Sequence, residues 1–169
     1  MLILKQMQNL KELNRFDVEI YADGSCRGNP GNGGYAFSFY IKDEQEWFLF
    51  GRGNKENTTN NQMELLSVIK SLEELEAKKM KFKTITVCSD SAYVVNGFLE
   101  NWIDKWEENN WKTNKGLSVL NQEYWKRLKR LVESNKVNFK KISRKCKKIN
   151  VVSKEAKYIA NILKKSKNH

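Results

Sequence analysis

Residues 18–23, VEIYAD, alternate between hydrophobic and polar positions, and this two-residue period predicts a β-strand. Two further apolar runs, at 35–42 and 46–54, predict two more strands. Three strands in series favour an antiparallel meander. The segment between the first two strands, residues 24–34, contains the only proline and is rich in glycine, so it is predicted to form turns.

The strongest helical pattern covers residues 57–80. Thr and Asn residues at its start supply an N-cap, and a glutamate follows soon after them. Apolar residues then recur at helical spacing: Leu65, Ile69, Leu72 and Leu75. The pattern therefore predicts a long helix with one face turned toward the core.

The rest of the chain continues to alternate between strand and helix patterns. We expect a strand at 83–90, helices at 91–109 and 120–135, a strand at 136–143 and a closing helix at 153–167. The predicted order is β-β-β-α-β-α-α-β-α, which indicates an α/β fold with a five-stranded mixed sheet flanked by helices.

Length and composition favour one globular domain. The chain has 169 residues, of which 40% are hydrophobic and 30% charged. We assign residues 17–169 to the domain and residues 1–16 to an N-terminal extension, which could form a short helix through Leu4, Met7, Leu10 and Leu13.

Several functional classes are disfavoured by the sequence. No apolar run approaches the roughly 20 residues that span a bilayer, and residues 1–16 lack the features of a secretory signal. Three scattered cysteines indicate neither a disulfide framework nor a zinc site. The only histidine is His169, which disfavours an internal histidine base. We expect no membrane association and no secretion, and a location in the cytoplasm or another intracellular compartment that holds nucleic acid.

The net charge of +11 is concentrated at one end of the chain. Residues 136–169 contain 12 Lys and Arg residues against a single acidic residue, whereas residues 1–135 are balanced. Such a basic segment predicts a polyanionic partner, most often nucleic acid. The alternative is a solvated helix and tail that only aid solubility.

Three acidic residues occupy positions at which a carboxylate is costly unless a cation meets it. Asp23 and Asp90 each end a hydrophobic strand, and Glu64 lies in the first turns of the long helix. Taken singly, each has a structural alternative as a turn residue or a partner of the helix dipole. Together they predict an oxygen-only site for Mg²⁺, with Mn²⁺ as an alternative, and two-metal phosphodiester hydrolysis.

Three segments carry a resemblance to a known family. YADGSCRGNPGNGGYAF, TTNNQMELLSVIKSLEEL and VCSDSAYVVNGFLENWIDKWEENNWKT resemble type 1 ribonuclease H in order and spacing, over about residues 17–163. The resemblance implies the ribonuclease H fold and magnesium-dependent endonucleolytic cleavage of the RNA strand of RNA–DNA hybrids. It also implies that Asp23, Glu64 and Asp90 are the catalytic metal ligands.

The same resemblance implies the residues that contact substrate. The glycine loop that begins at Gly24 and Ser25 would let backbone lie close to the RNA strand. Residues 102–113 resemble the family's handle, which grips DNA, although the Trp residues there could equally belong to the core. The implied nucleic-acid contacts are Gly24, Ser25, Asn29, Thr59, Asn60, Asn61, Trp102, Trp111 and Lys112.

The last motif departs from the family pattern. The family has a fourth carboxylate in its closing helix, and this sequence has Lys157 at that place. Such a change weakens binding of the second metal ion, because it alters the local charge by two units. Glu155 is the only acid nearby and lies about 200° away around the helix, so it could substitute only if the register shifts.

Three hypotheses follow from these patterns. The first is an active, monomeric ribonuclease H with altered metal affinity. The second is a protein that binds RNA–DNA hybrids, or double-stranded RNA or DNA through its basic segment 136–169, and has lost catalysis. The third is a structural module that reuses the fold.

Overall fold

A computed structural model describes residues 10–165 of the chain. It begins with the 3-10 helix η1 (Leu10–Arg15). The strands are β1 (Asp17–Gly28), β2 (Gly31–Ile41), β3 (Glu46–Thr58), β4 (Thr84–Ser89) and β5 (Val137–Lys141). The α-helices are α2 (Asn60–Ala77), α3 (Ala92–Leu99), α4 (Trp102–Glu108), α5 (Gln122–Asn135) and α6 (Lys147–Lys165).

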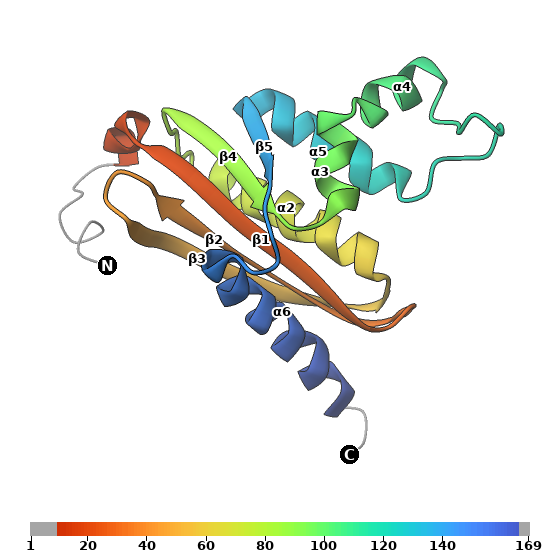
Figure 1. Ribbon diagram of the computed structural model, residues 1–169, viewed down its shortest axis with the longest axis horizontal. Helices are drawn as coiled ribbons and strands as arrows, with labels where there is room; N and C mark the ends of the chain where they lie inside the picture. Colours follow the sequence, from red (N-terminus) through yellow and green to blue (C-terminus); the bar gives the residue numbers. More distant parts are fainter. Residues whose placement is uncertain (1–9, 166–169) are drawn as a thin grey trace.

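The five strands form one mixed sheet in the order β3-β2-β1-β4-β5 (Figure 1). The β1–β2 and β2–β3 pairs are antiparallel, and the β1–β4 and β4–β5 pairs are parallel. The predicted fold class is therefore confirmed. Because β1 lies at the centre of the sheet, its residues are covered on both faces, and its side chains alternate between two cores.

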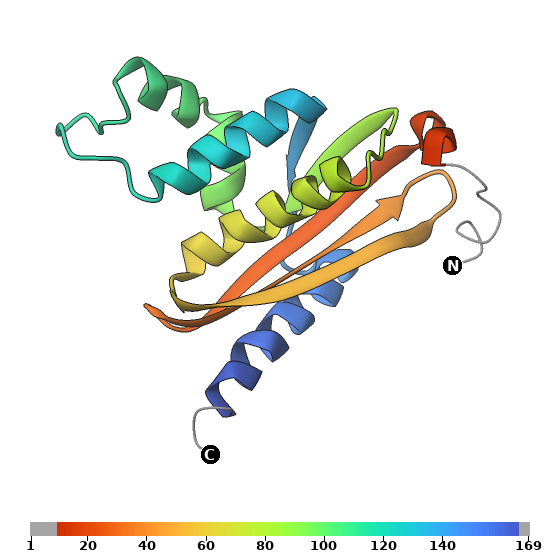
Figure 2. The same cartoon turned by 180° about the vertical axis from the view of Figure 1, so that it is seen from behind.

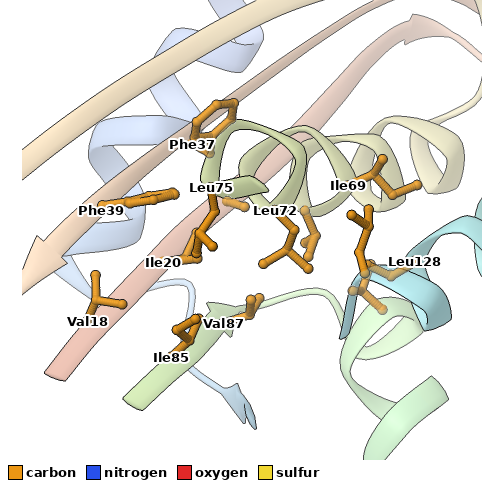
Figure 3. Close-up of a cluster of buried hydrophobic side chains, with 14 of the residues drawn as sticks. Val18, Ile20, Phe37, Phe39, Ile69, Leu72, Leu75, Ile85, Val87 and Leu128 are labelled. Carbon is orange, nitrogen blue, oxygen red and sulfur yellow. The ribbon is translucent and has the colours of Figure 1, made fainter. Parts of the chain in front are cut away.

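Helices cover both faces of the sheet. In Figure 1, α6 crosses one face over β1, β2 and β3, and Figure 2 shows α2 on the opposite face. Figure 3 shows the larger core, in which side chains of β1, β2 and β4 meet those of α2 and α5. A smaller core between the sheet and α6 consists of Tyr21, Ala36, Cys88, Ile149, Val152 and Ala156.

The interpretation of residues 24–34 as turns is wrong for most of the segment. β1 runs through Gly28 and β2 begins at Gly31, so the two strands form a long hairpin with full pairing from Val18↔Ile41 to Gly28↔Gly31. The glycines serve close packing instead. A Cβ at Gly34 would lie 2.3 Å from the carbonyl oxygen of Ala156, so glycine lets α6 approach the sheet.

Two helix boundaries also differ from expectation. The helix predicted at 91–109 is divided into α3 and α4, because Asn101 between them adopts the left-handed conformation with φ 55°. The closing helix was predicted to begin at residue 153, but α6 begins at Lys147. Ile149 and Val152 lie on its buried face and extend the apolar stripe toward its start.

The N-terminal segment contributes to the core before β1 begins. Leu13 in η1 is fully buried, and Phe16 is 6% exposed. Leu13 and Phe16 therefore pack in the hydrophobic core of the domain. Leu4 and Met7 lie outside the described residues. Over residues 10–165, no helix is both long enough and apolar enough to cross a membrane.

Candidate active site

Three separate elements bring the three predicted carboxylates together. Tyr21 on β1 pairs with Cys88 on β4, so Asp23 and Asp90 lie at the same level of two adjacent parallel strands. Glu64 comes from the start of α2, which crosses β1 at this level. The crossing is tight, because a Cβ at Gly24 would lie 2.5 Å from the Glu64 amide nitrogen. Glycine at 24 therefore allows α2 to sit against β1 beside Asp23.

The carboxylates repel one another in a partly buried setting. Burial is the main reason that the pKa of Asp23 is raised, and repulsion from Asp90 adds to it. Burial likewise raises the pKa of Glu64, and both Asp23 and Asp90 contribute further. The site thus carries negative charge that the protein alone does not fully compensate.

Hydrogen bonds fix the orientation of two of these acids. Ser91 Oγ donates to Glu64 Oε2 at 2.6 Å, and Asn60 Nδ2 donates to Glu64 Oε1 at 2.9 Å. Asp23 Oδ1 accepts from the Gly24 amide at 2.8 Å. The Ser153 side chain forms a further hydrogen bond with Asp23, which lowers its pKa against the effect of burial.

Arg144 meets the third acid. Its Nε lies 3.1 Å from Asp90 Oδ2, and the arginine side chain is 84% exposed while that of Asp90 is 13% exposed. The guanidinium therefore reaches from solvent, out of the loop that precedes α6, to cover the carboxylate.

Helix α6 places Lys157, and not Glu155, beside Asp23. The charge of Lys157 lowers the pKa of Asp23, and Ser153, one helical turn earlier, bonds the same carboxylate. Glu155 instead forms an ion pair with Arg52 on β3. The register shift that would let Glu155 serve as a fourth acid does not occur.

The predicted substrate-contacting polar residues gather at the start of α2. Thr59 is the N-cap, and its side chain accepts from the Gln62 amide at 3.3 Å as part of a capping box. Asn29 Oδ1 accepts from the Asn60 amide at 3.2 Å, which ties the tip of the β1–β2 hairpin to the helix. Asn61 is exposed, and Ser25 is partly exposed on β1.

The tryptophans of residues 102–113 divide between core and surface. Trp111 is 9% exposed and belongs to the larger core, beside Trp106. Trp102 is partly exposed and lines a depression of about 510 Å³ together with Lys105 and Lys112. In Figure 1, α4 and the loop after it project away from the sheet.

A chain of hydrogen bonds joins this projecting region to α2. Gln62 Nε2 donates to Asn121 Oδ1 at 3.1 Å, and Asn121 Nδ2 donates to the Tyr93 hydroxyl at 3.1 Å. Trp125 Nε1 donates to the same hydroxyl at 3.1 Å. The capping box that starts α2 is therefore connected to the helices that carry the projection.

Three residues in contact with the acids were absent from the sequence-based set: Ser91, Ser153 and Arg144. Ser91 follows Asp90 directly, and this adjacency is the one signal that could have identified it. Ser153 and Arg144 reach the site only through the placement of α6 and its preceding loop.

The donor chemistry of the site fits a hard divalent cation, because every acid offers oxygen and two of the acids have raised pKa values. Among residues 10–165, however, no group of three Asp, Glu, Cys or His side chains lies close enough together to bind one metal ion in this structure. Metal binding therefore requires the carboxylates of Asp23, Glu64 and Asp90 to move closer together.

The chain is similar to known proteins both as a family and in individual sequences. The family model described as RNase H matches residues 15–145. A ribonuclease H of Acetivibrio thermocellus is 43% identical over 126 residues, which cover 74% of this chain and 80% of that protein. A ribonuclease H of Thermoanaerobacter sp. is 44% identical over 130 residues, covering 76% of this chain and 79% of that one.

Solved structures show the same fold at lower identity. LC9-RNase H1, described as a type 1 RNase H with the type 2 active-site motif, has a TM-score of 0.71 at 24% identity, covering 87% of this chain and 73% of that one. LC11-RNase H1, solved in complex with RNA/DNA hybrid, has a TM-score of 0.66 at 19% identity, covering 86% and 98%.

Proposed function

This chain belongs to the type 1 ribonuclease H family and is an endoribonuclease for the RNA strand of RNA–DNA hybrids, and we propose that Asp23, Glu64 and Asp90 carry its reaction as ligands of divalent cations. The observation that carries the proposal is the convergence of these three carboxylates from β1, α2 and the end of β4, where burial and then mutual repulsion raise the pKa of Asp23 and Glu64. Mg²⁺ is the proposed ion, with Mn²⁺ as an alternative.

When bound, a divalent cation in such a site activates water for attack on the scissile phosphate and stabilises the leaving oxygen. The residues of this chain orient the ligands. Ser91 and Asn60 hold the two oxygens of Glu64, and the Gly24 amide and Ser153 hold Asp23. Fixed carboxylates reduce the reorganisation needed during the reaction.

Binding of the hybrid is proposed to use two groups of residues. Amides recognise 2′-hydroxyls because both groups donate and accept, so Asn29, Asn60 and Asn61 suit the RNA strand. Thr59 suits a DNA phosphate. On the projecting region, Trp102 and its neighbouring lysines form a concave, partly apolar surface of the kind that stacks on and attracts a nucleic-acid strand. The basic segment 136–169 adds long-range attraction.

The catalytic set comes from one chain, so we propose that a monomer is sufficient for activity. Asp23, Glu64, Asp90 and the groups that hold them all belong to the same fold. Sedimentation of the protein with and without hybrid would measure this directly, and activity confined to a dimer would contradict it.

The test is cleavage of an end-labelled RNA–DNA hybrid in EDTA, in Mg²⁺ and in Mn²⁺. We expect cleavage of the RNA strand only with metal, and loss of cleavage in Asp23→Asn with hybrid binding retained. Asp43→Asn is the matched control, because Asp43 is an exposed aspartate in the β2–β3 turn. Cleavage by Asp23→Asn at the parent rate would refute the assignment of Asp23.

A second candidate, binding of hybrid without cleavage, is favoured by one feature. Arg144 and Lys157 place positive charge against Asp90 and Asp23, where metal ions are expected. The family match and the curated relatives named ribonuclease H favour the enzyme. Salt-sensitive hybrid binding with no cleavage in either metal would favour the second candidate instead.

A further inference from the structure

One cationic side chain of this chain contacts a carboxylate of the site, and the charge of a second acts on another carboxylate. Arg144 Nε is 3.1 Å from Asp90 Oδ2. Lys157 follows Ser153 by one turn on the face of α6 that meets Asp23, and Ser153 is hydrogen-bonded to that acid. Arg144 belongs to the loop before α6 and Lys157 to α6 itself, which covers the face of the sheet opposite α2.

The formal charges of the site balance with a single divalent ion. Asp23, Glu64 and Asp90 contribute −3 when ionised, and Arg144 and Lys157 contribute +2. A scissile phosphodiester adds −1. One divalent ion then brings the total to zero, whereas two would leave an excess of +2 in a partly buried place, which is unfavourable.

The same count without the two cations gives the opposite result. Three carboxylates and one phosphodiester are neutralised by two divalent ions. Arg144 and Lys157 thus supply together the charge that one divalent ion would otherwise bring. They also act on different acids: Arg144 forms an ion pair with Asp90, and the charge of Lys157 acts on Asp23.

We propose that Arg144 and Lys157 take the place of one of the two expected divalent cations, so that this protein binds and uses a single divalent ion. The inference rests on the proposed function and concerns the number of ions at the same site. Glu64 and Asp23 are the natural ligands of that ion, because neither has a fixed guanidinium partner and Glu64 faces no cation among the described ion pairs.

The first measurement counts Mn²⁺ ions bound to the full-length protein, without nucleic acid, by electron paramagnetic resonance. We expect one ion for the parent and one ion, bound at least tenfold more tightly, for Lys157→Met, which removes a positive charge and adds no ligand. We expect two ions for Lys157→Asp. Lys81→Met is the control, because Lys81 is an exposed lysine outside the site.

The second measurement is the dependence of single-turnover cleavage on Mn²⁺ concentration below saturation. On logarithmic axes we expect a slope of one for the parent and a slope of two for Lys157→Asp. Circular dichroism melting of each variant shows whether it is folded. Two tightly bound ions in the parent, a parent slope of two, or equal Mn²⁺ affinity in Lys157→Met and Lys81→Met would overturn the inference.

The two proposals fail in distinguishable ways. Absence of cleavage in the parent and in Lys157→Asp, with folded proteins and either metal, would refute the proposed function. Cleavage by the parent with two tightly bound Mn²⁺ ions or a slope of two would overturn only the inference. Cleavage by Lys157→Asp with none by the parent would overturn both, since the cations would then obstruct the site.

Discussion

The Ser91 hydroxyl joins two elements by donating to Glu64 Oε2 at 2.6 Å and accepting from the Val94 amide at 3.3 Å. The second bond makes Ser91 the N-cap of α3. One side chain therefore fixes the start of α3 and the orientation of the acid on α2. A change at Ser91 should affect both stability and catalysis, and the two effects can be separated.

For Ser91→Ala we expect a loss of about 1 kcal/mol in the free energy of unfolding, because the helix cap is lost. We also expect metal affinity and cleavage rate to fall about 10- to 100-fold, because a residue that orients a metal ligand is removed. Ser91→Thr should restore most of both. Urea unfolding measures the free energy of unfolding, and Mn²⁺ titration measures the metal affinity. Parent-like metal affinity in Ser91→Ala would show that Ser91 does not orient Glu64 for metal binding.

Gly24→Ala should separate α2 from β1. The new Cβ would lie 2.2 Å from the Met63 carbonyl carbon, and backbone atoms cannot move aside as a flexible side chain would. We expect destabilisation of about 3 kcal/mol, at the upper end for overpacking, and a loss of activity because Asp23 and Glu64 move apart. Thermal melting and hybrid cleavage measure the outcome.

Gly116→Ala is the comparison for that substitution. Gly116 has φ +75° but no atom within 4 Å of a new Cβ, so the change introduces backbone strain without a clash. Stability should fall less than in Gly24→Ala, and activity should persist. Equal losses in the two variants would contradict the tight approach of α2 to β1.

The raised pKa values of Asp23 and Glu64 predict how stability depends on pH. Between the ordinary carboxyl range and the raised values, the folded protein binds more protons than the unfolded chain, so the free energy of unfolding falls as pH rises through that window. Without metal, Asp23→Asn should reduce this fall and raise the melting temperature near neutral pH by about 2–4 °C per kcal/mol of relieved repulsion. Calorimetry in EDTA from acid to neutral pH tests both statements, and a lower neutral melting temperature for Asp23→Asn would contradict them.

Metal binding should show the opposite pH dependence. Both acids must be ionised to bind a cation, so Mn²⁺ affinity should weaken as pH falls through the raised pKa values. The midpoint should lie above the ordinary carboxyl range of about 4. A midpoint at or below that range would show that burial and mutual repulsion do not raise the pKa values of these acids in solution.

Glu155→Gln should leave the reaction almost unchanged. Glu155 pairs with Arg52, whose side chain is 55% exposed, and such pairs contribute about 0–1 kcal/mol. We expect cleavage within twofold of the parent and a small change in melting temperature. A large loss of metal affinity would mean that Glu155 reaches the carboxylates in solution.

Lys112→Ala should weaken the binding of RNA–DNA hybrids to the same extent whatever their base sequence. Lys112 is exposed and lines the depression beside Trp102, where it is suited to a phosphate contact. We expect the slope of log affinity against log salt concentration to become shallower by about 1. Lys42→Ala, an exposed lysine at the end of β2, should leave the slope unchanged. An unchanged slope in Lys112→Ala would exclude it from the interface.

Local patterns predicted the order and class of the elements because each strand and helix has an apolar face whose period survives in the sequence. These patterns failed where tertiary packing determines the backbone conformation. The glycines at 24–34 form strands because helices press on both faces of the hairpin. The turn of chain at Asn101, which divides α3 from α4, has no glycine or proline to indicate it.

The acids could be predicted because Asp23 and Asp90 follow hydrophobic strand patterns and Glu64 lies near a helix start. The placement of Asp23 at the end of its strand is wrong, because β1 continues with paired residues through Gly28. Their partners could not, because Arg144 and Ser153 meet the site only after α6 docks on the sheet. Helical spacing from Ile149 through Val152 to Ala156 was available as a signal for the early start of α6. The density of lysines around it concealed the stripe.

The smaller core has a consequence for the order of synthesis. Tyr21, Ala36 and Cys88 are made early, but the helix that covers them is the last element of the chain. Until α6 leaves the ribosome, that face of the sheet stays bare, and Ser153 and Lys157 cannot reach Asp23. A nascent chain that has completed β5 therefore holds all three acids without the contacts from α6, so hydrolytic competence is acquired only after α6 has been made.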